Sequence, residues 1–268
     1  MADRLKPENK EAIKKIRKLE KEVAQKHNFK KYHNYYFPEN IVKTSSSVVT
    51  FGVGGDVACE KLMCIDNDNL RVFLHDPTPF TEDKVGDIIL ASGNKRYFKQ
   101  NIGYRETNRR LAKKFKYNPV GYSKTNGSKK FYFPTERYES GMIKKQEDVL
   151  NSYSTFDVWG QNNFVNVNFQ NIETTLQQLH LSKFDILKTD IEGNWYDCAN
   201  EIKDLNVDFR AWACEFELNV GYPLENNIEK AREVCNMFSD RCHIYVNKER
   251  LKQMMELIFI TKNESWDI

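Results

Sequence analysis

The chain has 268 residues, with 41 Lys and Arg against 38 Asp and Glu and a formal net charge of +3. This length suffices for one large α/β domain with a sizeable core, or for two small domains. So small a net charge gives no support to a nucleic acid partner, and neither a signal peptide nor a long apolar segment indicates secretion or a membrane span.

The six cysteines form no C-x-x-C pair, so the sequence gives no support to a zinc site. Several of them lie within apolar patterns, where a thiol behaves as a small core residue. We therefore expect a soluble protein of a reducing, cytoplasmic compartment. The many Lys and Asn residues are compatible with an AT-rich genome, including that of a large virus whose protein acts in the host cytoplasm.

Residues 1–43 are expected to form an N-terminal helical and aromatic extension. Over residues 7–27, apolar side chains recur at helical spacing among Lys and Glu, as in an amphipathic helix. This helix could be a lid, a contact between copies in a homo-oligomer, or a helix packed on its own domain; we favour the last. Residues 28–38 are rich in rings, which could line a substrate pocket or anchor the extension to the core.

The most informative segment is Val48-Val49-Thr50-Phe51-Gly52-Val53-Gly54-Gly55-Asp56. An apolar, β-branched run that ends in glycines predicts a strand, a tight turn and the start of a helix, which together cradle a nucleotide-type cofactor. About 20 residues further on, the apolar run 71–75 ends at Asp76, where an acid can accept hydrogen bonds from both hydroxyls of a ribose. A glycine-rich turn that binds nothing is the alternative interpretation.

The same loop favours S-adenosylmethionine over a phosphate-bearing cofactor. A dinucleotide fingerprint needs Gly or Ala three residues after Gly54, where this chain has Val57. Asp56 would repel a pyrophosphate placed at the helix N-terminus, and no Gly-Lys-Ser/Thr of a P-loop follows. S-adenosylmethionine carries an ammonium and a sulfonium but no phosphate, so an acid beside the loop attracts it.

From residue 47 onward, strand and helix patterns alternate. Strands are predicted at residues 48–53, 71–75, near 116–121, 184–189, 209–216, 242–246 and 257–261, and helices at 172–179, 196–205 and 226–238. This order predicts an α/β fold, with a mostly parallel sheet covered by helices on both faces. Residues 129–133 are expected to form the second arm of a β-hairpin, because Asn126-Gly127 favours such a turn.

Ligands bind such a sheet at the carboxyl ends of its strands, where the strand order reverses. The glycine loop, Asp76, Asp190 and Glu215 all fall near predicted strand ends. A second motif, Phe184-Asp185-Ile186-Leu187-Lys188-Thr189-Asp190-Ile191-Glu192-Gly193, reads as a buried strand that places Asp190 and Glu192 on one side of the chain. Capping of the following helix is the alternative role for these two acids.

Each of three further residues has two alternative roles. His75 could accept a proton at the mouth of the site, but a strand-end histidine bonded to backbone is the interpretation we favour. Tyr153 and Trp159 could stack on a sugar ring, or could be ordinary aromatic residues of a surface loop.

The glycine loop, the segment His75-Asp76-Pro77-Thr78-Pro79, and Ile172-Glu173-Thr174-Thr175-Leu176 leading to the second motif together resemble the FkbM family of methyltransferases. The likeness spans roughly residues 47–217, and the Leu-Lys-x-Asp-x-Glu-Gly segment is its most specific part. Family members often carry an acidic pair after Thr-Leu, whereas this chain has Gln177-Gln178.

The resemblance implies a Rossmann-like class I methyltransferase fold over residues 44–268 and O-methylation of sugars or glycosylated compounds. By position, Gly52, Gly54 and Asp56 would hold the methionine end of the cofactor, Asp76 would hold the ribose, and Asp190 would face the transferred methyl group. The full set of expected cofactor-binding residues is Phe51, Gly52, Gly54, Gly55, Asp56, Asp76, Pro77 and Thr78.

Methyl transfer to a hydroxyl is a direct displacement, so much of the rate comes from holding the reacting atoms in line. Asp190, with Glu192 or His75 as further catalytic candidates, would take the hydroxyl proton as the new bond forms. Asp190 and Glu215 could instead hold Mg²⁺, but we favour chemistry without a metal. The alternatives to a sugar or glycan acceptor are a protein, an RNA cap, a small metabolite, or a module that binds the cofactor without catalysis.

Overall fold

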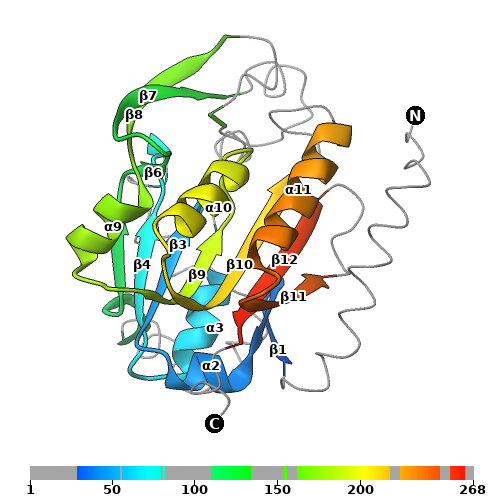
Figure 1. Cartoon of the computed structure of the whole chain (residues 1–268). Helices are drawn as coiled ribbons and strands as arrows, with labels where there is room; N and C mark the ends of the chain where they lie inside the picture. The colour runs from blue at the N-terminus through cyan, green and yellow to red at the C-terminus, as the bar shows by residue number, and fades with distance from the viewer. Residues whose placement is uncertain are drawn as a thin grey trace, which may run out of the picture.

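The computed structural model describes residues 29–54, 56–79, 81, 110–133, 154–155, 162–217, 224–247 and 254–262. Its centre is a seven-stranded sheet in the order β11-β12-β10-β9-β3-β4-β5 (Figure 1). The strands are β3 (Ser47–Phe51), β4 (Arg71–His75), β5 (Phe115–Asn118), β9 (Phe184–Thr189), β10 (Phe209–Glu217), β11 (Cys242–Asn247) and β12 (Met254–Thr261).

Six of these strands point the same way, and β12 runs antiparallel to both of its neighbours. Along the sequence, β4 and β5 follow β3 on one side of it in the sheet, and β9 and β10 are then added on its other side. The strand order therefore reverses between β3 and β9, which is where a doubly wound sheet forms its binding crevice.

Helices cover both faces of the sheet, as the alternating pattern predicts. Figure 1 shows α9 (Ile172–Leu179), α10 (Trp195–Asp204) and α11 (Leu224–Phe238) in front of the sheet, with α3 (Ala58–Asp66) behind it. A short helix, α2 (Glu39–Thr44), leads into β3. Strand residues alternate between the two cores: Val49 and Phe51 pack under α10 and α11, whereas Val48 packs with α3. The predicted Rossmann-like α/β fold, a mostly parallel seven-stranded sheet with helices on both faces, is confirmed.

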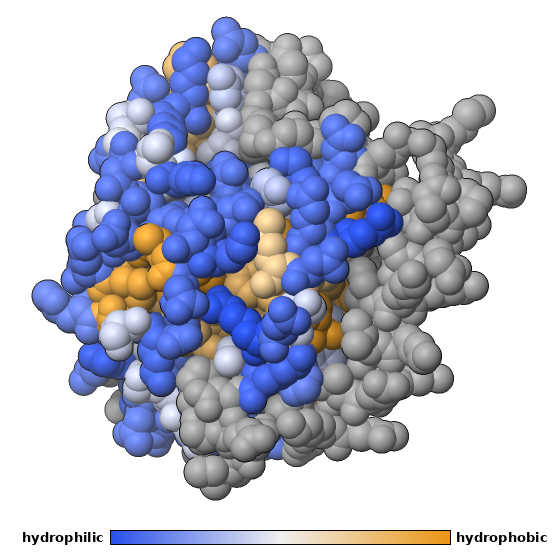
Figure 2. All heavy atoms as spheres, viewed as in Figure 1, coloured by the Kyte–Doolittle hydropathy of each residue, from blue (hydrophilic) through white to orange (hydrophobic). Residues whose placement is uncertain are grey.

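The visible outer surface of α9, α10 and α11 is mostly hydrophilic, with hydrophobic patches confined to the gaps between the helices (Figure 2). All six cysteines pack in or beside the two cores, as their apolar surroundings predict. Among the residues that the structure describes, no helix is both long enough and apolar enough to cross a membrane.

The ring-rich segment of the extension forms an antiparallel hairpin of β1 (Phe29–Tyr32) and β2 (Tyr35–Pro38). Its buried rings join the core on the α3 side of the sheet. The hydroxyl of Tyr32 donates to Asp66 Oδ2 over 2.8 Å, and the ammonium of Lys30 pairs with the same oxygen at 2.6 Å. These contacts fasten the hairpin to the end of α3. The helix expected over residues 7–27 lies outside the described residues.

A second, smaller sheet of β6 (Gly121–Tyr122), β8 (Phe164–Gln170) and β7 (Gly127–Tyr132) stands at the carboxyl end of the main sheet (Figure 1). The predicted hairpin around Asn126-Gly127 is wrong, because β8 lies between the two strands that flank this turn. Asn126 instead bonds the start of α9: its side chain donates to Thr174 Oγ1 and accepts from the Asn171 amide. A tertiary contact therefore replaces the local pairing.

Glu201 of α10 joins this smaller sheet to the start of α9. Its carboxylate accepts from the Tyr122 hydroxyl and the Ile172 amide, each over 2.9 Å. The side chain is buried, and burial raises the pKa of Glu201. One carboxylate thus satisfies two buried donors from different elements.

Replacing Glu201 by alanine should destabilise the protein by about 3 kcal/mol, because the buried donors of Tyr122 and Ile172 lose their acceptor. Urea denaturation followed by circular dichroism measures this loss. Lys203→Ala, at an exposed position of the same helix, is the control and should change the free energy of unfolding by less than about 0.5 kcal/mol. Equal effects of both substitutions would contradict this role of Glu201.

Candidate active site

The glycine loop leaves β3 at the point where the sheet reverses. Gly52 has a φ of +79°, and a Cβ placed on it would lie 1.7 Å from the backbone oxygen of Asp190. The loop is held on both sides, because the Gly52 amide donates to the His75 carbonyl and the Asp190 amide donates to the Phe51 carbonyl. Gly52 therefore allows the ends of β3, β4 and β9 to meet, as the sequence predicts.

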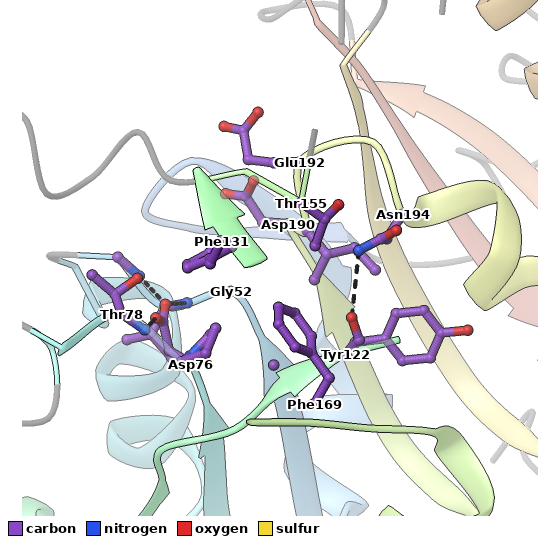
Figure 3. A pocket seen from close by; sticks show the side chains of 15 residues that line it. Gly52, Asp76, Thr78, Tyr122, Phe131, Thr155, Phe169, Asp190, Glu192 and Asn194 are labelled. Atoms are coloured by element: carbon purple, nitrogen blue, oxygen red, sulfur yellow. Dashed lines mark hydrogen bonds between the residues drawn. The ribbon is translucent and has the colours of Figure 1, made fainter. Parts of the chain in front are cut away.

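Asp76 closes the glycine loop through its carboxylate. Its Oδ2 accepts hydrogen bonds from the amides of Val53 and Gly54, over 2.7 and 2.8 Å. Its Oδ1 accepts from the Thr78 amide over 2.8 Å (Figure 3). A carboxylate has about four acceptor positions, so these three bonds leave one position at Oδ1. The acid expected to hold a ribose thus also organises the loop.

A pocket of about 210 Å³ opens at these strand ends. Figure 3 shows Asp76 and Thr78 on one side and Tyr122 and Asn194 on the other. The residues that line it are Gly52, Val53, Gly54, Asp76, Pro77, Thr78, Gly121, Tyr122, Phe131, Thr155, Phe169, Asp190, Ile191, Glu192 and Asn194. The structure thus brings together predicted residues from the β3, β4 and β9 ends.

Asp190 and Glu192, here called the acid pair, both line this pocket. The turn after β9 gives Glu192 and Gly193 positive φ angles of 32° and 86°, which keeps both acids at the strand end. Burial is the main cause, and the negative charges of Asp190 and Glu215 are the further causes, that together raise the pKa of Glu192 to about 8. A carboxyl group of this kind exchanges its proton near neutral pH.

The start of α10 lies directly after the acid pair. Helix α10 begins after Asn194, whose side chain makes no capping hydrogen bond; it donates instead to the Tyr122 carbonyl over 3.4 Å. The acids face the pocket while the helix starts beyond them.

Glu215 lies within β10, the strand next to β9, and is 3 % exposed. It does not line the pocket. The Tyr35 hydroxyl of the hairpin lies 3.2 Å from Glu215 Oε2 and 3.4 Å from Asp190 Oδ2. Among the described residues, no three acidic, histidine or cysteine side chains converge as a metal centre.

Among the described residues, four of the predicted site residues do not line the pocket: Phe51, Asp56, His75 and Glu215. His75 is the buried last residue of β4; its ring centroid lies 4.9 Å from that of Phe51, and burial lowers its pKa to about 4. Asp56 is half exposed; its carboxylate accepts from the Ala58 amide and pairs with His33 Nε2 at 3.0 Å. Gly55, Tyr153 and Trp159 fall outside the described residues.

The pocket also contains residues that the sequence did not single out. Phe131 and Phe169 bring two rings from the small sheet, and Tyr122, Thr155 and Asn194 bring polar atoms and backbone. Isolated aromatic and polar residues form no sequence motif. Phe131 and Phe169 come together only through the pairing of β7 with β8, which places their ring centroids 5.8 Å apart. No sequence signal marks their role.

No protein-family model matches this chain, and no curated protein matches it. Solved structures with a similar fold include the O-methyltransferase TomG from Streptomyces achromogenes in complex with SAM, with 10% identity, coverage of 94% of this chain and 90% of that chain, and a TM-score of 0.42. Cofactor-bound Rv0187 from MTB has 7% identity, the same coverages and a TM-score of 0.45. Methanococcus jannaschii fibrillarin has 8% identity, coverage of 83% and 69%, and a TM-score of 0.41.

Replacing Asp76 by alanine should weaken binding of an adenosyl cofactor by about 100-fold, because the amides of Val53, Gly54 and Thr78 lose the acceptor that shapes the loop. Isothermal titration calorimetry measures the affinity. Asp185→Ala is a matched control: its carboxylate also accepts backbone amides, at Ser46 and Ser47, but at the opposite end of the sheet. It should lower stability and leave the affinity unchanged.

Proposed function

We propose that this chain is an S-adenosylmethionine-dependent methyltransferase that methylates a hydroxyl group of a sugar or glycan. The proposal rests on the hydrogen bonds that the amides of the glycine loop make. The amides of Val53 and Gly54, which would bind a phosphate, donate instead to the carboxylate of Asp76. A phosphate at this loop would meet a negative charge rather than free donors.

The remaining residues of the pocket favour a cationic cofactor for the same reason. Asp76, Asp190 and Glu192 are all acids, and the first lies at the loop while the other two lie across the strand-order reversal. S-adenosylmethionine carries positive charge at its ammonium and its sulfonium and no phosphate. Gly52 lets the end of β3 lie against the backbone of Asp190, and the open position of Asp76 Oδ1 can accept one ribose hydroxyl.

When bound, the cofactor supplies an electrophilic methyl group. The acid pair of Asp190 and Glu192 would accept the proton of the acceptor hydroxyl while that oxygen displaces the methyl group from the sulfonium, whose C–S bond breaks. Because the two acids interact, the titration belongs to the pair, and the raised pKa of Glu192 suits a base that works near neutral pH. Phe131 and Phe169 offer ring faces to the acceptor and reduce the access of water.

The sugar acceptor rests on the resemblance to the FkbM family and on the combination of aromatic rings with carboxylates and the Asn194 amide in one pocket. Rings pack against the apolar face of a sugar, and carboxylates and amides accept or donate hydrogen bonds to its hydroxyls.

The test has two parts. Calorimetry should show binding of S-adenosylmethionine and no binding of NAD or ATP to the wild-type chain. Transfer of a labelled methyl group should then occur to members of a panel of sugars and glycans, and not to peptides, capped RNA or amines. Binding of NAD or ATP in place of the sulfonium compound would overturn the cofactor assignment. Transfer only to a non-sugar acceptor would overturn the acceptor class, and binding without any transfer would overturn catalysis.

A further inference from the structure

The hairpin at the N-terminal side of the described chain reaches the acid pair through a single hydroxyl. Tyr35 is the first residue of β2 and is 5 % exposed. Its hydroxyl lies 3.2 Å from Glu215 Oε2 on β10 and 3.4 Å from Asp190 Oδ2 at the end of β9. One phenol thus touches a carboxylate of the pocket and a carboxylate of the interior.

The position of this hydroxyl is fixed from three sides. The hairpin is fastened to α3 by the bonds of Tyr32 and Lys30 to Asp66. The ring of Tyr35 packs in the core on the α3 side, and the ammonium of Lys188 lies 4.5 Å from its centre. Lys188 in turn pairs with the buried Glu60 at 3.4 Å. Packing and charge therefore hold the phenol where the two carboxylates meet.

A phenol has one proton to donate, and two carboxylate oxygens stand beside it. When it donates to one acid, its oxygen can accept from the other only if that acid holds a proton. The three groups are therefore linked, because a change of protonation at Asp190 changes which bond the phenol makes with Glu215. A hydrogen bond donated to an ionised carboxylate favours the ionised form.

We infer that Tyr35 is a positioning residue of the active site, whose hydroxyl joins Asp190 to Glu215 and so holds the Asp190 carboxylate at the pocket. This inference rests on the proposed function for its catalytic meaning, but the linkage itself is a property of the protein without cofactor. It also assigns the hairpin of residues 29–38 a part in the site, beyond anchoring the extension to the core.

The charged and titratable groups nearest to Tyr35 either contact its ring or hydroxyl or interact with one of those direct partners. They are Asp190 and Glu192 after β9, Lys188 on β9, Glu215 on β10, Glu256 opposite Glu215 on β12, and Glu60 on α3. The carboxylates outnumber the ammonium in this set. Loss of a donor from such a cluster makes the folded protein hold more protons at a given pH.

The test compares Tyr35→Phe with Tyr32→Phe. Both substitutions remove only a hydroxyl from a buried ring of the same hairpin, and both break a bond to a carboxylate, but Tyr32 faces Asp66 away from the pocket. In Tyr35→Phe, kcat should be about tenfold lower near neutral pH and KM little changed, because a misplaced Asp190 affects proton transfer rather than substrate binding. Tyr32→Phe should leave kcat unchanged.

The second readout needs no methyl transfer. Between pH 6 and 9, the free energy of unfolding of Tyr35→Phe without cofactor should fall more steeply with rising pH than that of Tyr32→Phe, because its folded state holds more protons than its unfolded state. In a Glu215→Gln background, Tyr35→Phe should lose most of this effect. Equal slopes for the two tyrosine variants would overturn the inference whatever the activity. A steeper slope in a chain that transfers no methyl group would uphold the linkage and refute only the proposed function.

Discussion

Replacing Gly52 by alanine is expected to abolish cofactor binding and to destabilise the fold by about 3 kcal/mol or more. The φ of +79° is unfavourable for a residue with a Cβ, and that Cβ would lie 1.7 Å from the backbone oxygen of Asp190. The clash is with backbone, so β3 and β9 must separate at the strand-order reversal. The amide of Asp190, which donates to the Phe51 carbonyl, would move with them.

Gly127→Ala is the matched control for this substitution. Gly127 also has a positive φ, of +126°, but a Cβ there would meet nothing within 4 Å. Gly127→Ala should lower the free energy of unfolding only by the conformational penalty of a positive φ, about 1–2 kcal/mol, and should leave the affinity for S-adenosylmethionine unchanged. Urea denaturation and calorimetry measure both quantities. A Gly52→Ala chain that binds the cofactor with wild-type affinity would show that the contact with Asp190 is not required.

The sequence was sufficient for those elements whose pattern is local. The helix predicted over residues 172–179 has those bounds in the structure, where the Asn171 side chain caps its start by accepting from the Thr174 amide. The strands of the main sheet were also predictable, because strands buried on both faces are continuous apolar runs bounded by polar residues or glycine. The crevice followed from the same pattern, since the ends of β3, β4 and β9 share one edge.

Contacts between segments far apart in the sequence could not be predicted from local sequence patterns. The Asn126-Gly127 turn satisfies the local rule for a hairpin, but β8, some forty residues later along the chain, takes the place of the expected partner. Tyr35 is one ring among several in its segment, and its separation from Glu215 is 180 residues. Neither spacing nor composition indicates such a pair.

The roles of the two predicted acids also depend on neighbours that no motif encodes. Asp76 was predicted as a ribose ligand from its place after β4, but its three bonds to loop amides arise from how the loop turns back over it. Glu192 was predicted beside Asp190 from alternation alone. Its raised pKa comes from burial and from two like charges, one of which, Glu215, belongs to another strand.

Glu192→Gln is expected to lower kcat by about 100-fold or more while changing KM little, because it removes the group of the acid pair whose pKa best suits proton transfer. In the wild type, the rate should rise with pH through about 8, as Glu192 becomes ionised. The residual rate of the variant should lack this rise. Glu229→Gln, at an exposed position on α11, is the control and should retain the wild-type profile.

The same substitution should change the pH dependence of stability in a direction fixed by the sign of the pKa shift. The pKa of Glu192 is higher in the folded state than in the unfolded state, so its protonated form stabilises the fold fully at low pH. That contribution is lost as pH rises from about 4.5 to about 8. Glu192→Gln should therefore show a flatter loss of stability over this range, and should be more stable than the wild type at pH 9.

Glu215→Gln tests whether the charge of Glu215 contributes to the raised pKa of Glu192. Removing the charge of Glu215 takes away one of the causes that raise the pKa of Glu192, so the rising limb of the pH–rate profile should move to lower pH. A downward shift in Glu215→Gln, together with the absence of the limb in Glu192→Gln, would assign that limb to Glu192. If the limb persisted in Glu192→Gln, the proton would be taken by another group, and the acid pair would serve only to attract the cationic cofactor.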